Sequence, residues 1–293
     1  MLMKGTLLFF IFSFYSAMGF CDTILSNNQP PAEGNFALPA PQQPGPFLSF
    51  GQNIIGKNQI QIDFDPSYLY QTNSSFLALS TSFLYGLSDT ASIFFTLPVA
   101  VKYTTGSNHS SGLSDVSLQG EYAFYDNSNS KSTQQATMVT AITFPTGSST
   151  KNPPTGNDTY NFFIGGTYNQ IFIDWSWFVS PGINWFAVKD HTLMGSQYLY
   201  QFGIGKNFQS QRDRFIWAGL LELDGVYSEK NKLFGKKDPN SGGNIVNITP
   251  SLWYSTQTLI IQAGIAFPLL QQWNGNQSKT NYYATATLTW TID

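Results

Sequence analysis

The last stretch of the chain, Asn281–Ile292 (NYYATATLTWTI), decides the fold. Apolar side chains alternate there with threonines. Successive side chains of a β-strand point to opposite faces, so this stretch has one apolar face and one hydroxyl face. Tyr282 and Tyr283 stand near one end and Trp290 near the other. About ten alternating residues between aromatic side chains are typical of a strand that crosses an outer membrane.

The same alternation recurs along most of the chain from Gln59 onward. It predicts about twelve strands, with about ten or about fourteen as the alternatives, because outer-membrane barrels have even strand numbers. The predicted strands span 59–72, 75–85, 90–103, 113–125, 132–144, 160–168, 175–185, 198–204, 214–228, 246–254, 259–269 and 281–292.

The connections differ in length on the two sides of these strands. Those after the third, fifth, seventh, ninth and eleventh strands are long and rich in Gly, Asn, Pro, Ser or Lys, whereas those after the even-numbered strands are generally shorter. Long loops on one side and short turns on the other are typical of outer-membrane barrels. We therefore predict an all-β fold, a transmembrane up-and-down antiparallel β-barrel with both termini on the periplasmic side.

The composition favours a surface that faces lipid. Charged residues make up 11% of the chain, against about 25% in ordinary soluble domains. The main alternative is a secreted all-β sandwich, whose buried faces alternate in the same way. The single cysteine excludes an intramolecular disulfide, and the polar strand faces carry mostly Ser, Thr, Asn and Gln, which suit a wet lumen. The net charge of −3 gives no reason to expect a nucleic-acid partner.

The first residues have the pattern of a cleaved secretory signal peptide, which we place at residues 1–19. Lys4 supplies the positive charge, residues 7–14 the apolar run, and Ala17-Met18-Gly19 the cleavage site. Cys21 follows closely, so a lipid-anchored cysteine is an alternative. The bulky Phe20 before it disfavours lipidation and favours an incidental thiol.

Residues 20–58 form a separate Pro-rich segment between the signal peptide and the barrel, which we place at 59–293. Its prolines, from Pro30 to Pro46, are incompatible with a helix or an inner strand. We favour an extended tail on the periplasmic side. The alternative is a plug or latch that occupies the lumen.

Charged side chains on the predicted inner faces indicate a lumen that contains water, because buried charges must be paired or hydrated. The functional interpretation is an acidic pore lining that favours cations or neutral solutes over anions. The structural interpretation is that the carboxylates bond neighbouring strands or the Pro-rich segment and close the barrel. The residues concerned are Asp63, Asp65, Asp115, Glu121, Asp174, Glu222 and Asp224, with Lys102 as the clearest base among them.

Inward aromatic residues complete the predicted lumen lining. They could contact an aromatic solute, or they could simply fill the lumen of a small barrel. These residues are Phe94, Phe163, Phe178 and Trp253. Five tryptophans lie on predicted outer faces, where anchoring at the membrane interface is the better explanation: Trp175, Trp177, Trp185, Trp217 and Trp290.

The sequence predicts no catalytic or metal site. His109 and His191 are the only histidines, and both fall in predicted loops. Asp190 precedes His191, but adjacent loop residues usually point apart, and no nucleophile is identifiable beside them. Neither histidine has a partner at metal-ligand spacing. We therefore expect a protein that is not an enzyme and that needs no cofactor.

Several short motifs occur in a fixed order along the chain. They are Leu84-Tyr85-Gly86-Leu87-Ser88-Asp89, Gly112-Leu113-Ser114-Asp115-Val116, Phe144-Pro145-Thr146-Gly147, Ser241-Gly242-Gly243 through Thr249-Pro250-Ser251, Phe267-Pro268-Leu269 and residues 272–275. In this order, more than singly, they resemble the motifs of a Gram-negative outer-membrane transporter family named for the MetA pathway of phenol degradation. The resemblance implies a β-barrel channel for small solutes, aromatic compounds among them.

These observations together predict a porin-like channel or transporter of the bacterial outer membrane. It would pass small solutes, aromatic or hydrophobic ones among them, by passive uptake or efflux. Its expected partners are the lipid bilayer and the solutes, and the sequence predicts no oligomeric state. The alternative is a closed barrel that serves as a structural anchor or surface adhesin through loops Thr104–Ser111 and Glu229–Gly242. The second loop offers Lys230, Lys232, Lys236 and Lys237 to acidic surface sugars.

Overall fold

A computed structural model describes residues 29–292 of the chain. The predicted signal peptide and Cys21 lie outside the described residues. Helical structure within the described part is confined to two short 3-10 turns, η1 (Gly34–Phe36) and η2 (Ala40–Gln42). No helix between residues 29 and 292 is long and apolar enough to cross a membrane.

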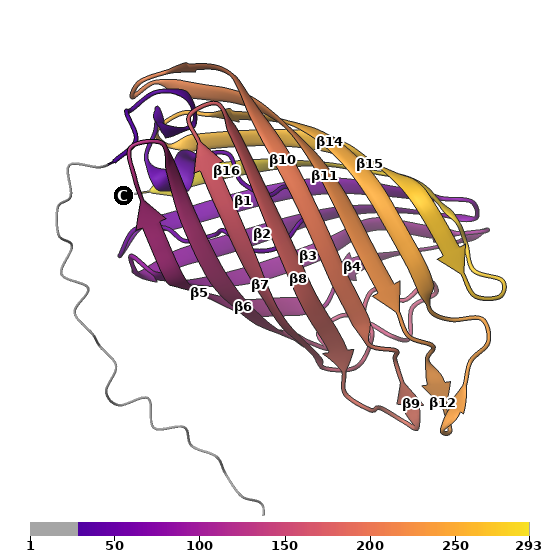
Figure 1. Ribbon diagram of the computed structural model, residues 1–293. Helices are drawn as coiled ribbons and strands as arrows, with labels where there is room; N and C mark the ends of the chain where they lie inside the picture. Colours follow the sequence, from indigo (N-terminus) through magenta and orange to yellow (C-terminus); the bar gives the residue numbers. More distant parts are fainter. Residues whose placement is uncertain (1–28, 293) are drawn as a thin grey trace, which may run out of the picture.

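Twelve long strands close into one antiparallel barrel, which confirms the predicted fold class (Figure 1). Each strand pairs with its neighbours in chain order, and β1 pairs with both β2 and β16, which closes the barrel. The strands are β1 (Ile60–Gln71), β2 (Ser74–Ser88), β3 (Ala91–Thr105), β5 (Val116–Ser128), β6 (Ser132–Phe144), β7 (Asn161–Phe172), β8 (Trp175–Phe186), β10 (Gln197–Gln211), β11 (Phe215–Ser228), β14 (Gly243–Ser255), β15 (Leu259–Trp273) and β16 (Thr280–Ile292).

Four short strands belong to the connections. β4 (Asn108–Leu113) folds back on the end of β3. β9 (Thr192–Leu193), β12 (Lys232–Leu233) and β13 (Lys236–Lys237) form a separate small sheet beyond the barrel rim (Figure 1).

The two ends of the barrel differ in their connections. The end that carries the C-terminus, here called the terminal end, has turns of two or three residues: 89–90, 129–131, 173–174, 212–214 and 256–258. The opposite end, here called the loop end, carries the long connections 145–160, 187–196 and 229–242. This division matches the pattern of short turns and long loops predicted from the sequence.

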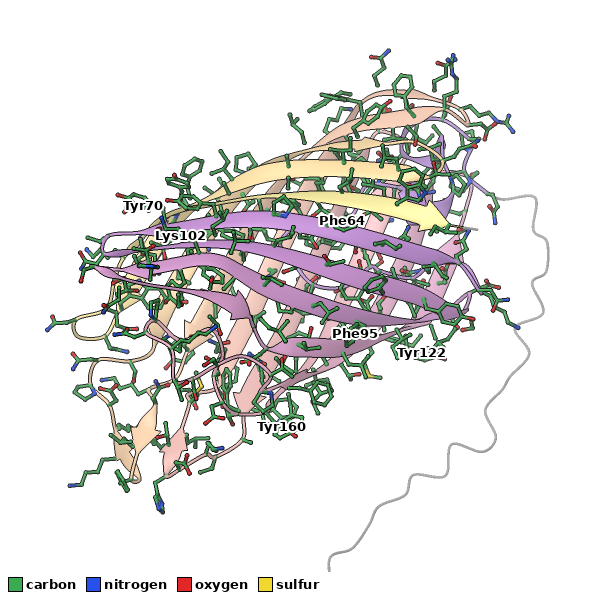
Figure 2. The ribbon with its side chains drawn as sticks, turned by 180° about the vertical axis from the view of Figure 1, so that it is seen from behind. Phe64, Tyr70, Phe95, Lys102, Tyr122 and Tyr160 are labelled. Carbon is green, nitrogen blue, oxygen red and sulfur yellow. The ribbon has the colours of Figure 1, made fainter. Side chains whose placement is uncertain are left out.

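Large apolar side chains cover the outer face of the barrel. Phe64 on β1 and Phe95 on β3 are 43% and 37% exposed, and both are labelled in Figure 2. Residues directly opposite each other in neighbouring strands share a face, and Phe64 stands opposite Leu288 of β16. An apolar outer face of this kind would be costly in water but is what a lipid surface requires.

Tryptophans mark the outer face near both rims. Trp175, Trp217 and Trp290 lie at the terminal end of their strands and are 41%, 41% and 59% exposed. Trp185 lies near the loop end, stacked on Phe162 at a centroid distance of 6.0 Å. Their distribution is that of an interfacial aromatic belt.

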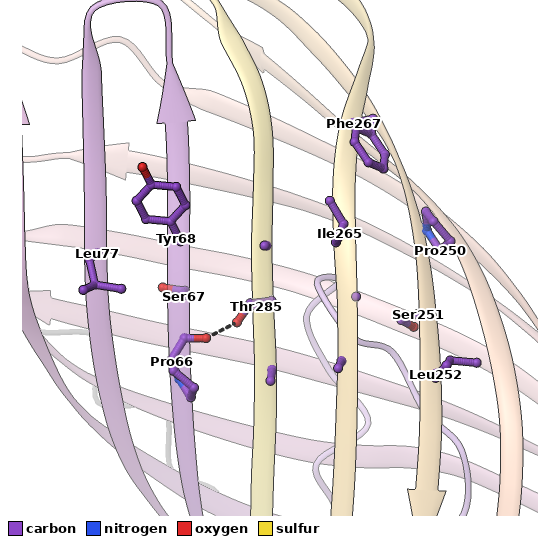
Figure 3. A pocket seen from close by; sticks show the side chains of 14 residues that line it. Pro66, Ser67, Tyr68, Leu77, Pro250, Ser251, Leu252, Ile265, Phe267 and Thr285 are labelled. Carbon is purple, nitrogen blue, oxygen red and sulfur yellow. Dashed lines mark hydrogen bonds between the residues drawn. The ribbon is translucent and has the colours of Figure 1, made fainter.

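A shallow groove of about 660 Å³ runs across β1, β14, β15 and β16 on the outer face (Figure 3). Small side chains form its floor, namely Ala263, Ala284 and Ala286, and larger ones such as Phe267 border it. Pro66 has no N–H to donate to the neighbouring strand. Its carbonyl accepts a hydrogen bond from the Thr285 hydroxyl at 3.0 Å. The groove therefore faces the acyl-chain side of a barrel embedded in lipid.

Most of the segment 29–58 lies inside the barrel, where it bonds the inner wall, so the favoured prediction of an extended periplasmic tail is wrong for this described part. The segment, here called the plug, enters at the terminal end and reaches the middle of the barrel. It then returns to the start of β1, where Lys57 N bonds Asp89 of the β2–β3 turn at 2.9 Å. Its prolines deprive it of regular secondary structure, so its backbone finds hydrogen-bond partners on the polar inner wall.

Candidate functional site

The plug begins with contacts to the turns of the terminal end. The Asn35 amide donates to the carbonyl of Ile173 in the β7–β8 turn at 2.7 Å, and the Asp213 amide donates to the carbonyl of Ala37 at 2.8 Å. The Gln42 side chain then donates to the Thr291 hydroxyl of β16 at 2.6 Å. The start of the plug is therefore fixed to opposite parts of the rim.

A buried apolar cluster joins this part of the plug to the wall. Ala37 and Leu38 of the plug pack with inward residues of β11, β14 and β15. The wall residues are Ile216, Ala218, Leu220, Trp253 and Ile260. The predicted lumen residue Trp253 is thus 6% exposed and contributes to the packing of the plug.

Glu222 of β11 holds the turning point of the plug. Its carboxylate accepts hydrogen bonds from three consecutive backbone amides, those of Phe47 at 2.5 Å, Leu48 at 2.9 Å and Ser49 at 3.3 Å. The side chain is fully buried, with 0% exposure. A buried carboxylate requires such donors, and bonds to a charged acceptor are stronger than those between neutral groups.

Asp224, two residues further along the same face of β11, continues this contact. It accepts hydrogen bonds from the hydroxyls of Ser49 at 3.0 Å and of Thr249 on β14 at 2.8 Å. Gln201 of β10 accepts the next amide of the plug, Phe50 N, at 3.2 Å. Four consecutive plug residues are therefore bonded to one side of the barrel wall.

Glu121 of β5 holds the returning arm of the plug from the opposite side. It accepts hydrogen bonds from the backbone amide of Asn53 at 2.9 Å and from its side-chain amide at 2.7 Å. Gln119 on the same strand donates to the same carboxylate at 2.7 Å. Glu121, Glu222 and Asp224 are thus engaged by the plug, as the structural interpretation of these carboxylates expected.

Aromatic packing secures the middle of the plug. Phe50 meets Phe163 of β7 edge to face, with a centroid distance of 4.7 Å. Glycines of the wall make room for the two rings, because a Cβ atom at Gly165 would lie 2.5 Å from the Phe50 ring and one at Gly182 would lie 2.7 Å from that of Phe163. Phe178, a further predicted lumen residue, is buried on β8 with 4% exposure, and its ring lies over Gly203 of β10.

Asp63 and Asp65 of β1 face inward, and the plug does not bond them directly. Both line a cavity of about 240 Å³ between the plug and the inner wall. Phe94 and Trp253 line the same cavity. A second cavity of about 480 Å³ lies between the plug and strands β5, β6 and β7.

Asp115 binds a connection at the loop end of the barrel. Its carboxylate accepts hydrogen bonds from the backbone amides of Gly147 at 2.9 Å and Asn157 at 2.7 Å, both in the connection 145–160. This connection lies beside inward residues such as Gln71 and Tyr103, with which it lines a cavity of about 370 Å³. The loop therefore folds across the inner rim of the barrel.

Two residues predicted to face the lumen lie elsewhere. Lys102 pairs with Leu77, an outward residue, because a β-bulge between Ala100 and Lys102 shifts the alternation of β3 by one residue. Lys102 is therefore exposed on the outer face near the loop end (Figure 2). Asp174 lies in the turn 173–174 between β7 and β8, where its side chain is exposed.

The histidines take ordinary positions in the connections. His109 lies on β4 opposite Thr104, and His191 stacks on Phe234 of the neighbouring loop at 5.1 Å.

The plug residues that meet the wall were missed by sequence reasoning, namely Asn35, Gln42, Ser49 and Asn53. The sequence signal for them was the density of Asn and Gln between the prolines. That composition alone does not distinguish a solvated tail from a segment that hydrogen-bonds the inner wall of the barrel. On the wall, Gln201 and Gln262 were also missed, although both are buried.

Comparisons with known proteins give a structural likeness without a sequence match. No protein-family model and no curated protein matches the chain. The fold is similar to the COG4313 outer membrane channel from Pseudomonas putida F1, with a TM-score of 0.67 and 13% identity over 85% of this chain and 100% of that chain. The NanC porin has a TM-score of 0.49 and 11% identity over 78% of this chain and 98% of that one. At this identity the likeness to the channel shows the fold, an outer-membrane β-barrel.

Proposed function

We propose that the chain is an outer-membrane channel for small solutes whose lumen is held closed by its own N-terminal segment. The observation that carries this proposal is the set of buried carboxylates on opposite walls, Glu121 on one side and Glu222 with Asp224 on the other, that bond the plug backbone and side chains. Passage of a solute requires the plug to move, and no chemical step is involved.

Two further observations support a channel rather than a packed barrel. The inner wall is polar even where the plug does not bond it, as at Asp63 and Asp65. Cavities of about 240, 480 and 370 Å³ remain between the plug, the wall and the loop 145–160. The inner face of a barrel with a permanently packed interior would carry apolar side chains, because these pack without needing hydrogen-bond partners.

Membrane orientation and solute class belong to the same proposal. We place the terminal end on the periplasmic side, because short turns lie there in outer-membrane barrels. Aromatic solutes are the class implied by the resemblance of the short motifs to those of the phenol-pathway family. Phe163 and Trp253 pack against the plug, so they become available to such a solute only when the plug moves.

The test is swelling of liposomes that contain the refolded mature chain, challenged with neutral sugars and phenol. The double variant Glu222→Gln/Asp224→Asn weakens the plug contacts, and Glu229→Gln, just beyond the same strand and exposed, is the matched control. We expect slow swelling with the parent chain and the control, and swelling several-fold faster with the double variant. Heat-shifted gel mobility verifies that each barrel has formed.

A permanently closed barrel is the second candidate, favoured by the number of bonds that fix the plug. It would act as an anchor or as an adhesin through the connections at the loop end. Equal swelling rates for the folded double variant, the control and empty liposomes would contradict the channel and leave this candidate standing.

A further inference from the structure

The cavity between the plug and strands β1, β15 and β16 has an unbalanced charge. Asp63 and Asp65 project into it from the same face of β1, two residues apart. Its lining within the described residues contains no Lys, Arg or His. The two ion pairs recorded between residues 29 and 292 lie elsewhere, between Lys189 and Asp158 and between Arg212 and Asp213.

Unpaired polar atoms face this cavity. The Asp63 Oδ1 atom is buried and accepts no hydrogen bond from the described residues. Gln262 of β15 is 4% exposed and lines the cavity, and its Nε2 atom has no partner there either. A buried acceptor such as Asp63 Oδ1 needs a donor, and a buried donor such as Gln262 Nε2 needs an acceptor, so the two atoms indicate a bound group that the protein itself does not supply.

Asp63 and Asp65 differ from the other buried carboxylates of the inner wall, because the plug does not bond them. Glu121 and Glu222 each receive hydrogen bonds from the plug, and Asp224 receives them from the plug and from Thr249. Asp63 and Asp65 receive hydrogen bonds from the wall instead, from the hydroxyls of Thr289 and Thr287 on β16. The plug passes along the Asp63 cavity as well, with Phe47 and Asn53 among its lining residues, but it contributes no positive charge there. The negative charge of Asp63 and Asp65 thus remains available to a ligand.

Aromatic faces complete the lining. Phe94 of β3 and Trp253 of β14 border the cavity, and the indole N–H of Trp253 is fixed by the Ser255 hydroxyl at 2.9 Å. An aromatic face attracts a cation, and it does so more strongly where water is excluded. Carboxylates together with aromatic rings match an organic ammonium ion better than a bare metal ion, which would leave the rings unused.

We infer that this cavity binds a small organic ammonium ion that also carries an oxygen acceptor, with Asp63 and Asp65 as counter-charges and Phe94 and Trp253 as the aromatic walls. The free Nε2 atom of Gln262 donates a hydrogen bond to that oxygen. The volume of about 240 Å³ limits the ligand to a small molecule. The inference deepens the proposed function and rests on it for the route by which the ion reaches the lumen.

The test is isothermal titration calorimetry on the refolded mature chain in detergent, with tetramethylammonium chloride as the probe. Sodium chloride and tert-butanol, a neutral molecule of similar shape, are titrated in parallel. We compare the parent chain with Asp63→Asn/Asp65→Asn. Asp126→Asn is the matched control, because Asp126 lines the separate cavity beside β5.

We expect saturable binding of tetramethylammonium to the parent chain and to the control, and binding at least tenfold weaker in the double variant. Equal affinity in all three proteins would overturn the inference, and so would equally tight binding of tert-butanol or of sodium. Phe94→Leu keeps both carboxylates and provides a second test if the double variant does not fold. Binding several-fold weaker than in the parent supports the aromatic wall, and unchanged binding contradicts it.

The titration tests the ammonium site, and the swelling assay tests the channel, so each claim can be contradicted without the other. Binding of the probe in a barrel that never passes solutes would keep the site and remove the channel. Faster swelling of the Glu222→Gln/Asp224→Asn variant without probe binding would keep the channel and remove the site.

Discussion

The carboxylates of the inner wall differ in whether they bond the plug, and their positions in the sequence do not reveal this difference. Glu222 and Asp63 both follow the alternation of their strands, and both face inward. Only Glu222 meets consecutive backbone amides of the plug. The difference is set by which plug residue passes in front of each carboxylate, and this is a property of the folded chain.

Replacing Glu222 with Gln should loosen the turning point of the plug. The amide retains one acceptor oxygen and turns its NH₂ group toward N–H donors, so at least one buried amide loses its partner. The cost is about 1–3 kcal/mol, which corresponds to hydrogen exchange about five- to 150-fold faster. Exchange at the amides of Phe47, Leu48 and Ser49, measured by mass spectrometry or NMR, should rise, while Glu229→Gln leaves it unchanged. Unaltered exchange in the folded variant would contradict the role of Glu222.

Neighbouring glycines of β7 offer a matched pair for the aromatic contact. A Cβ atom at Gly165 would lie 2.5 Å from the Phe50 ring, whereas one at Gly166, on the other face, would meet a carbonyl at an ordinary 3.5 Å. We expect Gly165→Ala to displace Phe50 at a cost of about 1–3 kcal/mol, and Gly166→Ala to have little effect. Exchange at the Phe50 amide is the measurement, and equal rates in the two variants would contradict the packing described.

At the scale of elements, the strands were predictable because their signal is local. Alternation with period two is written in each strand, and all twelve predicted runs correspond to long strands. The limits were less accurate where the strand continues beyond the apolar band. The strand predicted at 198–204 extends over Gln197–Gln211, because its last residues, Lys206 to Gln211, are mostly polar and a bulge near Phe208 breaks the alternation.

The plug was not predictable in the same way. Its prolines exclude helix and inner strand, and that prediction holds, since only two 3-10 turns occur there. Whether such a segment remains outside or fills a lumen depends on partners distant in sequence, such as Glu222 for Phe47. Lys102 illustrates the same limit on a smaller scale, because a bulge depends on the pairing of two strands.

The connection 145–160 is an element whose position depends on Asp115. Asp115→Asn removes a charged acceptor from the Gly147 and Asn157 amides, so we expect the loop to open and to be cleaved several-fold faster by added protease. Asp158 of the same loop forms only an exposed ion pair with Lys189 at 3.6 Å. Asp158→Asn should therefore change the cleavage rate little. Equal rates for both variants would show that Asp115 does not hold the loop.

At the scale of the whole molecule, the plug connects strands that the barrel separates. Its contacts reach the turns at Ile173 and Asp213 and the inner faces of β3, β5, β7, β10, β11, β14 and β16. The barrel itself is closed by its strand ladder without the plug. A barrel without the plug should therefore fold, and its lumen should be wider.

The most direct test of the account is the conductance of the barrel in planar lipid bilayers, with and without residues 29–55. Both proteins must first show the heat-shifted gel mobility of a folded barrel. We predict that the shortened chain opens steady pores in salt solution, while the intact chain conducts only briefly or not at all. Equal conductance of the two proteins, whether both open or both closed, would contradict the claim that the plug closes this channel.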